Sequence, residues 1–297
     1  MNSSSSRRVL WTVVLVLLVA LGIGAYLVLS KKPPAPEPAK PAPVAEVPPA
    51  EKEETIGKSV QGRAIDAYTY GTGPTHLLFV GGIHGGYEWN SAALAYRFMD
   101  YLKEDPAHVP AQFTVTVIPS ANPDGLYKVI GKEGQFSLAD APTKDDETGR
   151  GRLNAHNVDL NRNFDCKWQA TSTWRNTPVG AGTSAFSEPE TAAIRDYVSK
   201  FKPAAAVFWH SQSNAVYASE CKNGVLPETL DIMNAYSKAS KYPAVKSFTA
   251  YPVSGDAEGW LASIGIPAIT VELESHTAVS WDRNLAGIQA LFDYFSK

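Results

Sequence analysis

The chain has 297 residues, of which 44% are hydrophobic and 19% are charged, and its formal net charge is −3. A chain of this length and composition can bury a hydrophobic core of its own. The near-neutral charge, without a basic cluster in the body of the chain, excludes nucleic acid as an expected partner.

The amino-terminal part contains an unbroken, mostly apolar run over residues 9–29. As a helix, this run is long enough to cross the roughly 30 Å hydrocarbon layer of a membrane. It exceeds the apolar region of a signal peptide, and no cleavage signature follows it closely, so we expect an uncleaved single-pass anchor. Two basic residues lie on each side of the apolar run, Arg7 and Arg8 before it and Lys31 and Lys32 after it, so the positive-inside rule does not decide the orientation. We expect residues 1–8 to stay in the cytoplasm and the rest of the chain to lie on the extracytoplasmic side of the cell membrane.

A proline-rich segment, residues 30–55, follows the apolar run and also carries many lysines and glutamates. It has no apolar periodicity, and such segments favour an extended polyproline II conformation over a fold. We therefore expect a linker over residues 30–55 and one folded domain over residues 56–297.

Within this domain, apolar runs of strand length alternate with helical patterns. The patterns predict strands at 76–82, 113–120, 204–210 and 268–273, and helices at 91–103, 226–240 and 284–295. Ser187 with Glu190 has the spacing of a capping box and predicts a further helix start there. The alternation predicts an α/β fold, a three-layer α/β/α sandwich with a mixed, mostly parallel sheet.

Three side chains at predicted strand ends have the chemistry of a metal site. His84 and Glu88 follow the first strand, and His210 ends the third. A catalytic zinc site needs three such nitrogen or carboxylate ligands and leaves one position open. Each residue alone would fit an ordinary polar turn or a hydrogen-bonded histidine, but the three together favour a metal.

Two further stretches of the sequence could support such a site. In NVDLNRNF (157–164), Asp159 could hold the second ring nitrogen of His84, and Arg162 could grip a carboxylate with two parallel hydrogen bonds. By itself the segment also fits an ordinary polar loop. Glu272 lies near the end of an apolar strand, where an ionised carboxylate costs free energy unless it is paired or has a catalytic role. It is therefore a candidate general base, and Glu274 is the alternative residue for this role.

Cys166 and Cys221 are the two cysteines of the chain. They would stay reduced in a cytoplasmic protein and can pair outside the membrane, so the expected location favours a disulfide.

Taken together, these segments resemble the zinc carboxypeptidases of the carboxypeptidase A type. The resemblance covers most of residues 75–297, and its stretches occur in the family's order: GGIHGGYE, NPDG, RLNAHNVDLNRNF, FSEPET, WHS, YPVSGDAEGW and ITVEL. It implies a catalytic domain in which one Zn²⁺ ion is bound by His84, Glu88 and His210, with Asp159 behind His84. The family motif has two residues between its histidine and glutamate, whereas this chain has three.

The resemblance also implies catalytic roles. Glu272 would take a proton from a zinc-activated water and pass it to the leaving amine. Arg152 would polarise the scissile carbonyl, although Arg150 is close enough in sequence to serve instead. Since water is the nucleophile, no covalent intermediate is required.

Substrate contacts follow from the same resemblance. Asn161 and Arg162 would hold the terminal carboxylate, Tyr251 would close over the substrate, and Glu258 would lie at the floor of the side-chain pocket. With Asp256 nearby, the pocket would favour a basic or amine-bearing terminal residue. The alternative is that both acids face solvent.

The expected function is that of a membrane-anchored metallocarboxypeptidase acting on peptides or peptidoglycan stem peptides with a free C-terminal carboxylate. Relatives of this fold also cleave N-acyl amino acids, so a zinc amidohydrolase or deacylase is an alternative. A third possibility is a peptide-binding module without activity.

Overall fold

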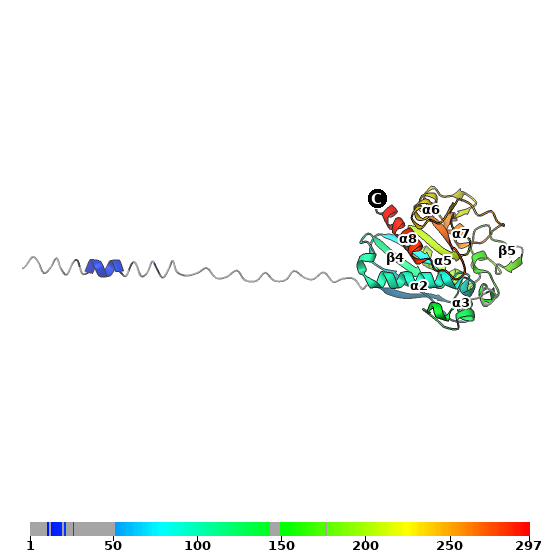
Figure 1. Ribbon diagram of the computed structural model, residues 1–297, viewed down its shortest axis with the longest axis horizontal. Coiled ribbons are helices and arrows are strands. Elements are labelled where there is room, and N and C mark those ends of the chain that lie inside the picture. The colour runs from blue at the N-terminus through cyan, green and yellow to red at the C-terminus, as the bar shows by residue number, and fades with distance from the viewer. Residues whose placement is uncertain are drawn as a thin grey trace, which may run out of the picture. The chain divides into compact units, whose positions relative to one another are not determined.

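A computed structural model of the chain (Figure 1) describes Trp11, residues 13–19, Leu21, Tyr26 and residues 51–142, 149–175 and 177–297. The chain divides into two compact units, Met1–Glu46 and Val47–Lys297.

The expected cytoplasmic end at residues 1–8, and most of the anchor and linker up to residue 50, lie outside the described residues. Within the part that is described, none of the helices combines the length and the apolar character that a membrane crossing requires.

The main sheet has eight strands in the spatial order β1-β2-β4-β3-β7-β12-β8-β11. Their bounds are β1 (Lys52–Lys58), β2 (Ala64–Tyr70), β3 (Thr75–Val80), β4 (Phe113–Ile118), β7 (Ala205–Ser211), β8 (Ala215–Ala218), β11 (Ala244–Val245) and β12 (Ala268–Leu273). The neighbours β4, β3, β7 and β12 run parallel, and so do β8 and β11. The antiparallel pairs are β1 with β2, β2 with β4, and β8 with β12. The sheet is therefore mixed with a parallel centre, as expected.

Helices and two small hairpins surround this sheet. The α-helices are α2 (Trp89–Glu104), α3 (Pro123–Ile130), α5 (Pro189–Phe201), α6 (Pro227–Ser240), α7 (Ala257–Ser263) and α8 (Trp281–Phe295). The 3₁₀ turns are η1 (Gly85–Glu88), η2 (Pro106–His108), η3 (Leu138–Asp140), η4 (Gly149–Gly151) and η5 (Leu160–Arg162). The hairpins pair β5 (Thr171–Trp174) with β6 (Thr177–Gly180), and β9 (Glu220–Cys221) with β10 (Gly224–Val225).

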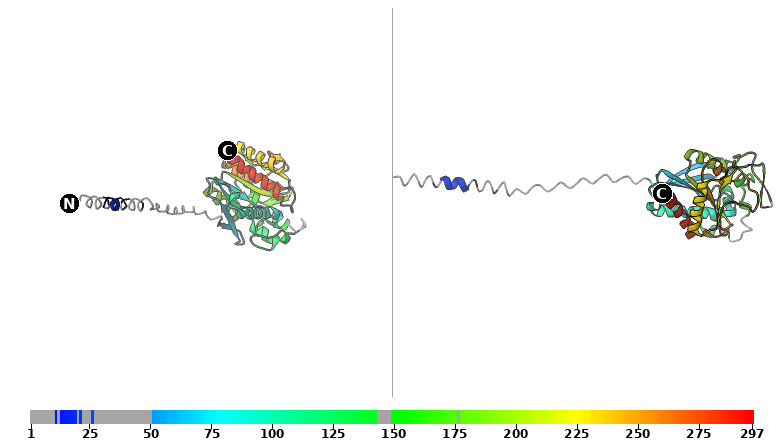
Figure 2. Two further views of the ribbon diagram at one scale, coloured as in Figure 1. Left: turned by 60° about the vertical axis from the view of Figure 1, so that its left-hand side comes forward. Right: turned by 90° about the horizontal axis from the view of Figure 1, so that it is seen from above.

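The two faces of the sheet carry separate hydrophobic cores, because successive side chains of a strand point to opposite faces. Leu77 and Phe79 of β3 pack with α2, α6 and α8, whereas Leu78 and Val80 pack with α5 and α7. In Figure 2, α6 and α8, coloured yellow and red, lie side by side over one face. This is the three-layer α/β/α arrangement expected from the alternating pattern.

The domain begins earlier than expected. Residues 52–55, assigned to the linker, belong to β1, which pairs antiparallel with β2. Since β1 is an edge strand with mostly exposed side chains, its sequence KEETIGK can carry charge and shows no apolar pattern. The folded domain thus includes residues before Ile56.

The start of α5 also differs from the expectation. The helix begins at Pro189, so its N-cap is Glu188, and no side-chain capping bond is made. Ser187 instead donates to Glu188, and Glu190 accepts a hydrogen bond from the backbone of Val60. The capping-box prediction is wrong because the N-cap is Glu188 and not Ser187, and because Glu190 binds the backbone of another segment.

Candidate active site

Three neighbouring parallel strands deliver polar side chains to one edge of the sheet. His84 follows β3, His210 lies near the end of β7, and Glu272 lies near the end of β12. These strands are adjacent in the order β3-β7-β12, so residues distant in the sequence meet at their carboxyl ends. This is where open α/β sheets bind ligands.

The extra residue between His84 and Glu88 is taken up by a tight 3₁₀ turn, η1. Gly85 has a φ of +48°, a left-handed value that favours glycine, and a side chain there would meet Gly151 O at 2.6 Å. Glu88 ends this turn and leads into α2. The turn returns the Glu88 carboxylate to the His84 ring despite the longer spacing.

The three proposed ligands converge. His84 Nδ1 lies 2.8 Å from Glu88 Oε1, and His210 Nδ1 lies 3.1 Å from Glu88 Oε2 and 3.3 Å from His84 Nδ1. One ligand atom from each residue lies within 4.8 Å of the others, and all three side chains are buried. Two nitrogens and a carboxylate at this separation fit the three-ligand set of a catalytic zinc ion.

The electrostatics of the three residues suit a cation. Burial opposes the charge of Glu88, but the His84 and His210 rings hold its pKa below the usual range. Burial likewise opposes the charge of His210, but the Glu88 carboxylate raises the pKa of this imidazole well above its ordinary value. A divalent ion in the same place would replace the proton of His210 as the partner of the carboxylate.

Asp159 lies behind His84, as expected. Its Oδ1 is 3.4 Å from His84 Nε2, and its Oδ2 accepts from Arg152 Nη2 at 2.8 Å. Burial opposes its charge, but the Arg152 guanidinium holds the Asp159 pKa well below the usual range. Arg152 lines the cavity described below, whereas Arg150 is exposed and does not. The structure therefore favours Arg152 over Arg150 for the oxyanion.

Glu272 lines the same cavity as His84, Glu88 and His210, whereas its rival Glu274 does not. Glu272 pairs in register with His210 and accepts from Ser213 N at 3.1 Å. Burial and the charge of Glu88 raise the pKa of Glu272 to about 7. Glu274 is exposed and forms an ion pair with Arg283 at 3.1 Å.

A cavity of about 650 Å³ opens over these groups. Asn161, Arg162 and Tyr251 lie in its wall with Glu272 and Arg152. Arg162 donates from Nη1 to Asn161 O at 2.6 Å and from Nε to Thr173 O at 3.2 Å, so its guanidinium is fixed in the wall. The side-chain oxygen of Asn161 accepts from Ala257 N, which leaves its nitrogen as the group that can donate to a substrate carboxylate.

Glu258, expected at the floor of the side-chain pocket, also contacts a metal-ligand candidate. It lines the cavity, but its Oε1 lies 3.1 Å from His210 Nε2 and accepts from Thr270 Oγ1 at 2.9 Å. Asp256, also in the cavity wall, caps α7 by accepting from Gly259 N. Burial and the charge of Glu258 raise the Asp256 pKa to about 6.

A family model described as zinc carboxypeptidase matches residues 44–280. The chain belongs to the zinc carboxypeptidase family. The resemblance found in the sequence is thereby confirmed, and the family together with the donor set assigns zinc to the site of His84, Glu88 and His210.

Several curated relatives share this zinc carboxypeptidase region. Gamma-D-glutamyl-L-diamino acid endopeptidase 1 of Lysinibacillus sphaericus is 25% identical over 75% of this chain and 60% of its own length. Carboxypeptidase B of Helicoverpa zea is 28% identical, over 69% of this chain and 52% of its own. Murein peptide amidase A of Escherichia coli K12 is 28% identical, over 41% of this chain and 50% of its own length. The matches thus span 50–60% of the length of these relatives.

Solved structures of zinc carboxypeptidases and amidases share the fold. Bovine thrombin-activatable fibrinolysis inhibitor, in complex with tick carboxypeptidase inhibitor, superposes with a TM-score of 0.67 at 19% identity, covering 84% of this chain and 91% of that one. The murein-tripeptide amidase of Escherichia coli O157 superposes with a TM-score of 0.56 at 20% identity, covering 82% of this chain and 90% of that one.

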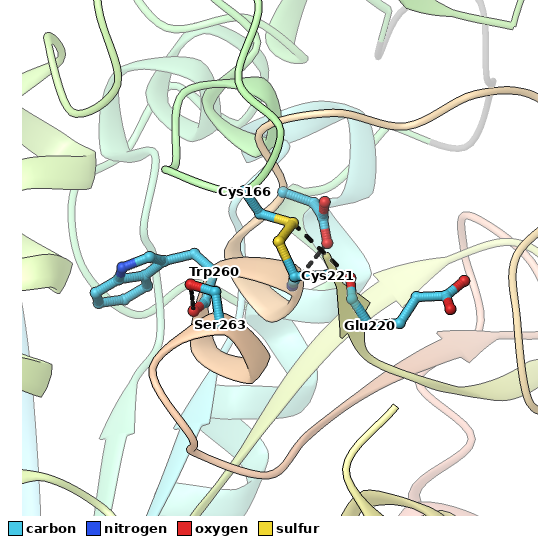
Figure 3. Close-up of a disulfide and its surroundings, with 7 residues drawn as sticks. Cys166, Glu220, Cys221, Trp260 and Ser263 are labelled. Atoms are coloured by element: carbon cyan, nitrogen blue, oxygen red, sulfur yellow. Dashed lines mark hydrogen bonds between the residues drawn. A yellow bond between two sulfur atoms is a disulfide. The ribbon is translucent and has the colours of Figure 1, made fainter. Parts of the chain in front are cut away.

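A disulfide joins two segments of the chain that line the cavity. Cys166 and Cys221 are paired, with their Cα atoms 5.9 Å apart (Figure 3). Cys166 follows the loop that carries Asn161 and Arg162, and Cys221 lies in β9 next to Glu220. The sequence left the pairing open because it depended on the side of the membrane.

Two aromatic residues of the site were missed in the sequence. The Arg152 guanidinium lies 4.3 Å from the centre of the Trp174 ring and 5.5 Å from that of Tyr87, and these two rings contact each other edge to face. Tyr87 is one of the three residues between His84 and Glu88, but Trp174 comes from the β5 hairpin. No local pattern could have linked a distant tryptophan to the site.

Proposed function

We propose that the chain is a zinc-dependent metallocarboxypeptidase that hydrolyses the C-terminal bond of a peptide. The observation that supports this most is that one cavity holds the metal ligands, a candidate base, an oxyanion cation and a carboxylate-binding pair. Its lining includes His84, Glu88, His210, Glu272, Arg152, Asn161, Arg162 and Tyr251.

In the proposed mechanism, zinc supplies Lewis acidity and lowers the pKa of a water toward about 7. Glu272 accepts a proton from the attacking water as the oxygen adds to the carbonyl carbon. Glu272 then donates that proton to the amine nitrogen as the C–N bond breaks. Arg152 stabilises the negative charge that develops on the carbonyl oxygen.

Binding of the free carboxylate sets which bond is cut. Asn161 and Arg162 offer donors on the cavity wall, and a carboxylate held there fixes the distance from the chain end to the reacting carbonyl. Tyr251, packed on Phe248 at 4.8 Å between ring centres, closes over the bound end. Asn161, Arg162 and Tyr251 suit the terminal carboxylate of a peptide, which favours a carboxypeptidase over a deacylase.

We further propose that the substrate ends in a basic or amine-bearing residue, such as lysine, arginine or diaminopimelate. Asp256 and Glu220 put negative charge on the cavity wall. The endopeptidase and the murein amidase among the relatives, whose names refer to diamino acids and murein, support a stem-peptide substrate. Matched peptides ending in Lys, Phe and Asp test this: kcat/KM should be highest for Lys, and equal values would remove the acidic-wall argument.

Metal analysis of the purified chain and digestion of a peptide library, read by mass spectrometry, test the activity itself. We expect about one zinc per chain and release of single C-terminal residues. Products cut only at N-acyl groups would favour the deacylase, and zinc binding without any cleavage would favour a binding module.

Localisation is a further proposal. The apolar run at 9–29 and the proline-rich segment after it support a membrane-anchored enzyme, and the disulfide fits an oxidising compartment outside the cytoplasm. In cell fractions the chain should stay with membranes after an alkaline carbonate wash and be released by detergent. Recovery in the soluble fraction without cleavage would contradict the anchor.

A further inference from the structure

Each ring nitrogen of His210 faces a different carboxylate. Nδ1 lies 3.1 Å from Glu88 Oε2, inside the ligand cluster, and Nε2 lies 3.1 Å from Glu258 Oε1, on the far side of the ring. The side chains of His210 and Glu258 are 2% and 3% exposed. The ring is thus held between the metal position and a second, buried acid.

Glu258 is itself held in place. Thr270 Oγ1 donates to its Oε1 at 2.9 Å, from the strand next to β7. The first turn of α7, which carries Glu258, is anchored at its start, where Ala257 N donates to Asn161 Oδ1 at 2.8 Å. The carboxylate therefore approaches His210 from a fixed backbone.

A carboxylate in this position has a chemical consequence for a metal ligand. An imidazole that binds a metal through Nδ1 carries its proton on Nε2, and an acceptor for that proton fixes the tautomer and ring orientation and makes the ligand more basic. Asp159 lies behind His84, with Oδ1 3.4 Å from Nε2, but Arg152 Nη2 lies closer to the same nitrogen, at 3.0 Å. The contact of Glu258 with His210 is therefore the shorter and more direct of the two carboxylate contacts.

We propose that Glu258 is a positioning residue of the zinc site, acting through His210, rather than a group that reads the substrate side chain. The proposal rests on the proposed function for the role of zinc. It leaves Asp256, the N-cap residue of α7 in the cavity wall, as the neighbouring acid that can select the substrate's terminal residue.

Zinc affinity of the full-length protein tests this without any turnover. Dissociation constants for wild type, Glu258→Ala, Glu258→Gln and Asp256→Asn would be measured by competition with a chromophoric chelator. We expect Glu258→Ala to weaken zinc binding by about 10–100-fold, and Glu258→Gln less, because an amide oxygen still accepts from Nε2. Asp256→Asn removes the neighbouring charge but keeps a good helix cap, so its affinity should match wild type.

Zinc affinity of Glu258→Ala equal to that of wild type overturns the proposal, as does an equal loss in Asp256→Asn. Should Glu258→Ala fail to fold, Glu258→Gln and Thr270→Val decide: weaker binding in either supports the role, and unchanged binding in both overturns it. A wild-type protein that binds no zinc would refute the proposed function instead.

Two readouts separate positioning from substrate reading. In the zinc-loaded protein, NMR should show a slowly exchanging Nε2 proton of His210 that shifts in Glu258→Ala. A positioning role also predicts that Glu258→Ala lowers kcat/KM by the same factor for peptides ending in Lys, Phe and Asp. A loss confined to the Lys peptide would overturn the proposal and return Glu258 to the substrate pocket.

Discussion

Glu272 and His210 lie directly beside each other, because β12 and β7 pair in parallel with these two residues in register. Paired residues on neighbouring parallel strands point to the same face of the sheet. A hydrogen bond of 3.1 Å from Ser213 N holds the Glu272 carboxylate. The candidate base is therefore held beside a metal ligand by strand pairing, not by a loop alone.

Substituting Glu272→Gln should lower kcat by about 10²–10⁴-fold, because the amide cannot accept a proton from water. The zinc content should stay as in wild type, since Glu272 is outside the ligand cluster. Steady-state kinetics on a C-terminal peptide, with metal analysis of the same samples, checks both.

Glu274→Gln is the matched control for this substitution, because Glu274 is an exposed acid two positions further on that pairs with Arg283. Its kcat should equal that of wild type. Unchanged turnover in Glu272→Gln would remove Glu272 from the mechanism.

The raised pKa of Glu272 predicts a pH dependence of stability in the zinc-free protein. Burial and the charge of Glu88 raise this pKa from 4.5 to about 7, so the folded state holds the proton more tightly than the unfolded state. Wild type should therefore lose stability relative to Glu272→Gln as the pH rises from about 4.5 to 7, with no further loss above that.

Denaturant unfolding of both zinc-free proteins across this pH range gives the difference directly. A bound cation lowers the pKa of a neighbouring acid. With zinc bound, the loss of stability in wild type should therefore occur at lower pH. A difference that grew in wild type's favour with rising pH would show that the Glu272 pKa is not raised.

The centre of the fold could be predicted because its strands are buried on both faces. β12 has the expected bounds, and β3, β4 and β7 differ from expectation by only a few residues at their ends. β1 and β2 were not predicted, since an exposed edge strand and its half-exposed neighbour lack a continuous apolar run.

Helices α3 and α7 were missed for a different reason. Both are short, and each is started by a side-chain cap, from Asn122 to Gly125 N and from Asp256 to Gly259 N. In the sequence, these two caps look like ordinary turn residues. The metal ligands could be predicted from their positions at strand ends, but the Glu258 to His210 contact depends on how α7 packs on β12, which no sequence spacing encodes.

Arg162 should be needed for substrates with a free C-terminus. Its guanidinium is fixed in the cavity wall by the carbonyls of Asn161 and Thr173, so Arg162→Ala removes one charged donor group from a rigid position. Losing a hydrogen bond to a charged group costs about 1.5–3 kcal/mol, which lowers kcat/KM by roughly 10–150-fold.

Peptides with an amidated C-terminus supply the second arm of this test. Amidation should slow wild type strongly but slow Arg162→Ala little further, because both changes remove the same ion pair. Arg195→Ala, on an exposed ion pair of α5 with Asp196, is the control and should behave as wild type. Additive effects of Arg162→Ala and amidation would show that Arg162 does not bind the carboxylate.

The disulfide should stabilise both the domain and its substrate site. It closes a 55-residue separation between Cys166 and Cys221, and in the chain-entropy account such a crosslink contributes about 2–4 kcal/mol. Removing both cysteines, as Cys166→Ala with Cys221→Ala, should lower Tm by roughly 4–16 °C for a domain of this size. Because Cys166 and Glu220 line the cavity, KM should rise more than kcat falls.

Reduction provides the matching control for the disulfide. Dithiothreitol should shift the Tm of wild type toward that of the double variant. It should leave the Tm of the double variant unchanged, since Cys166 and Cys221 are the only two cysteines of the chain. The segment after Arg162 is also held to Gly255 by backbone hydrogen bonds, from Phe164 N to Gly255 O and from Gly255 N to Cys166 O. These bonds should keep the fold after reduction, so an intact zinc content with a higher KM is the expected state. Loss of zinc on reduction would mean instead that the crosslink supports the metal ligands as well as the substrate wall.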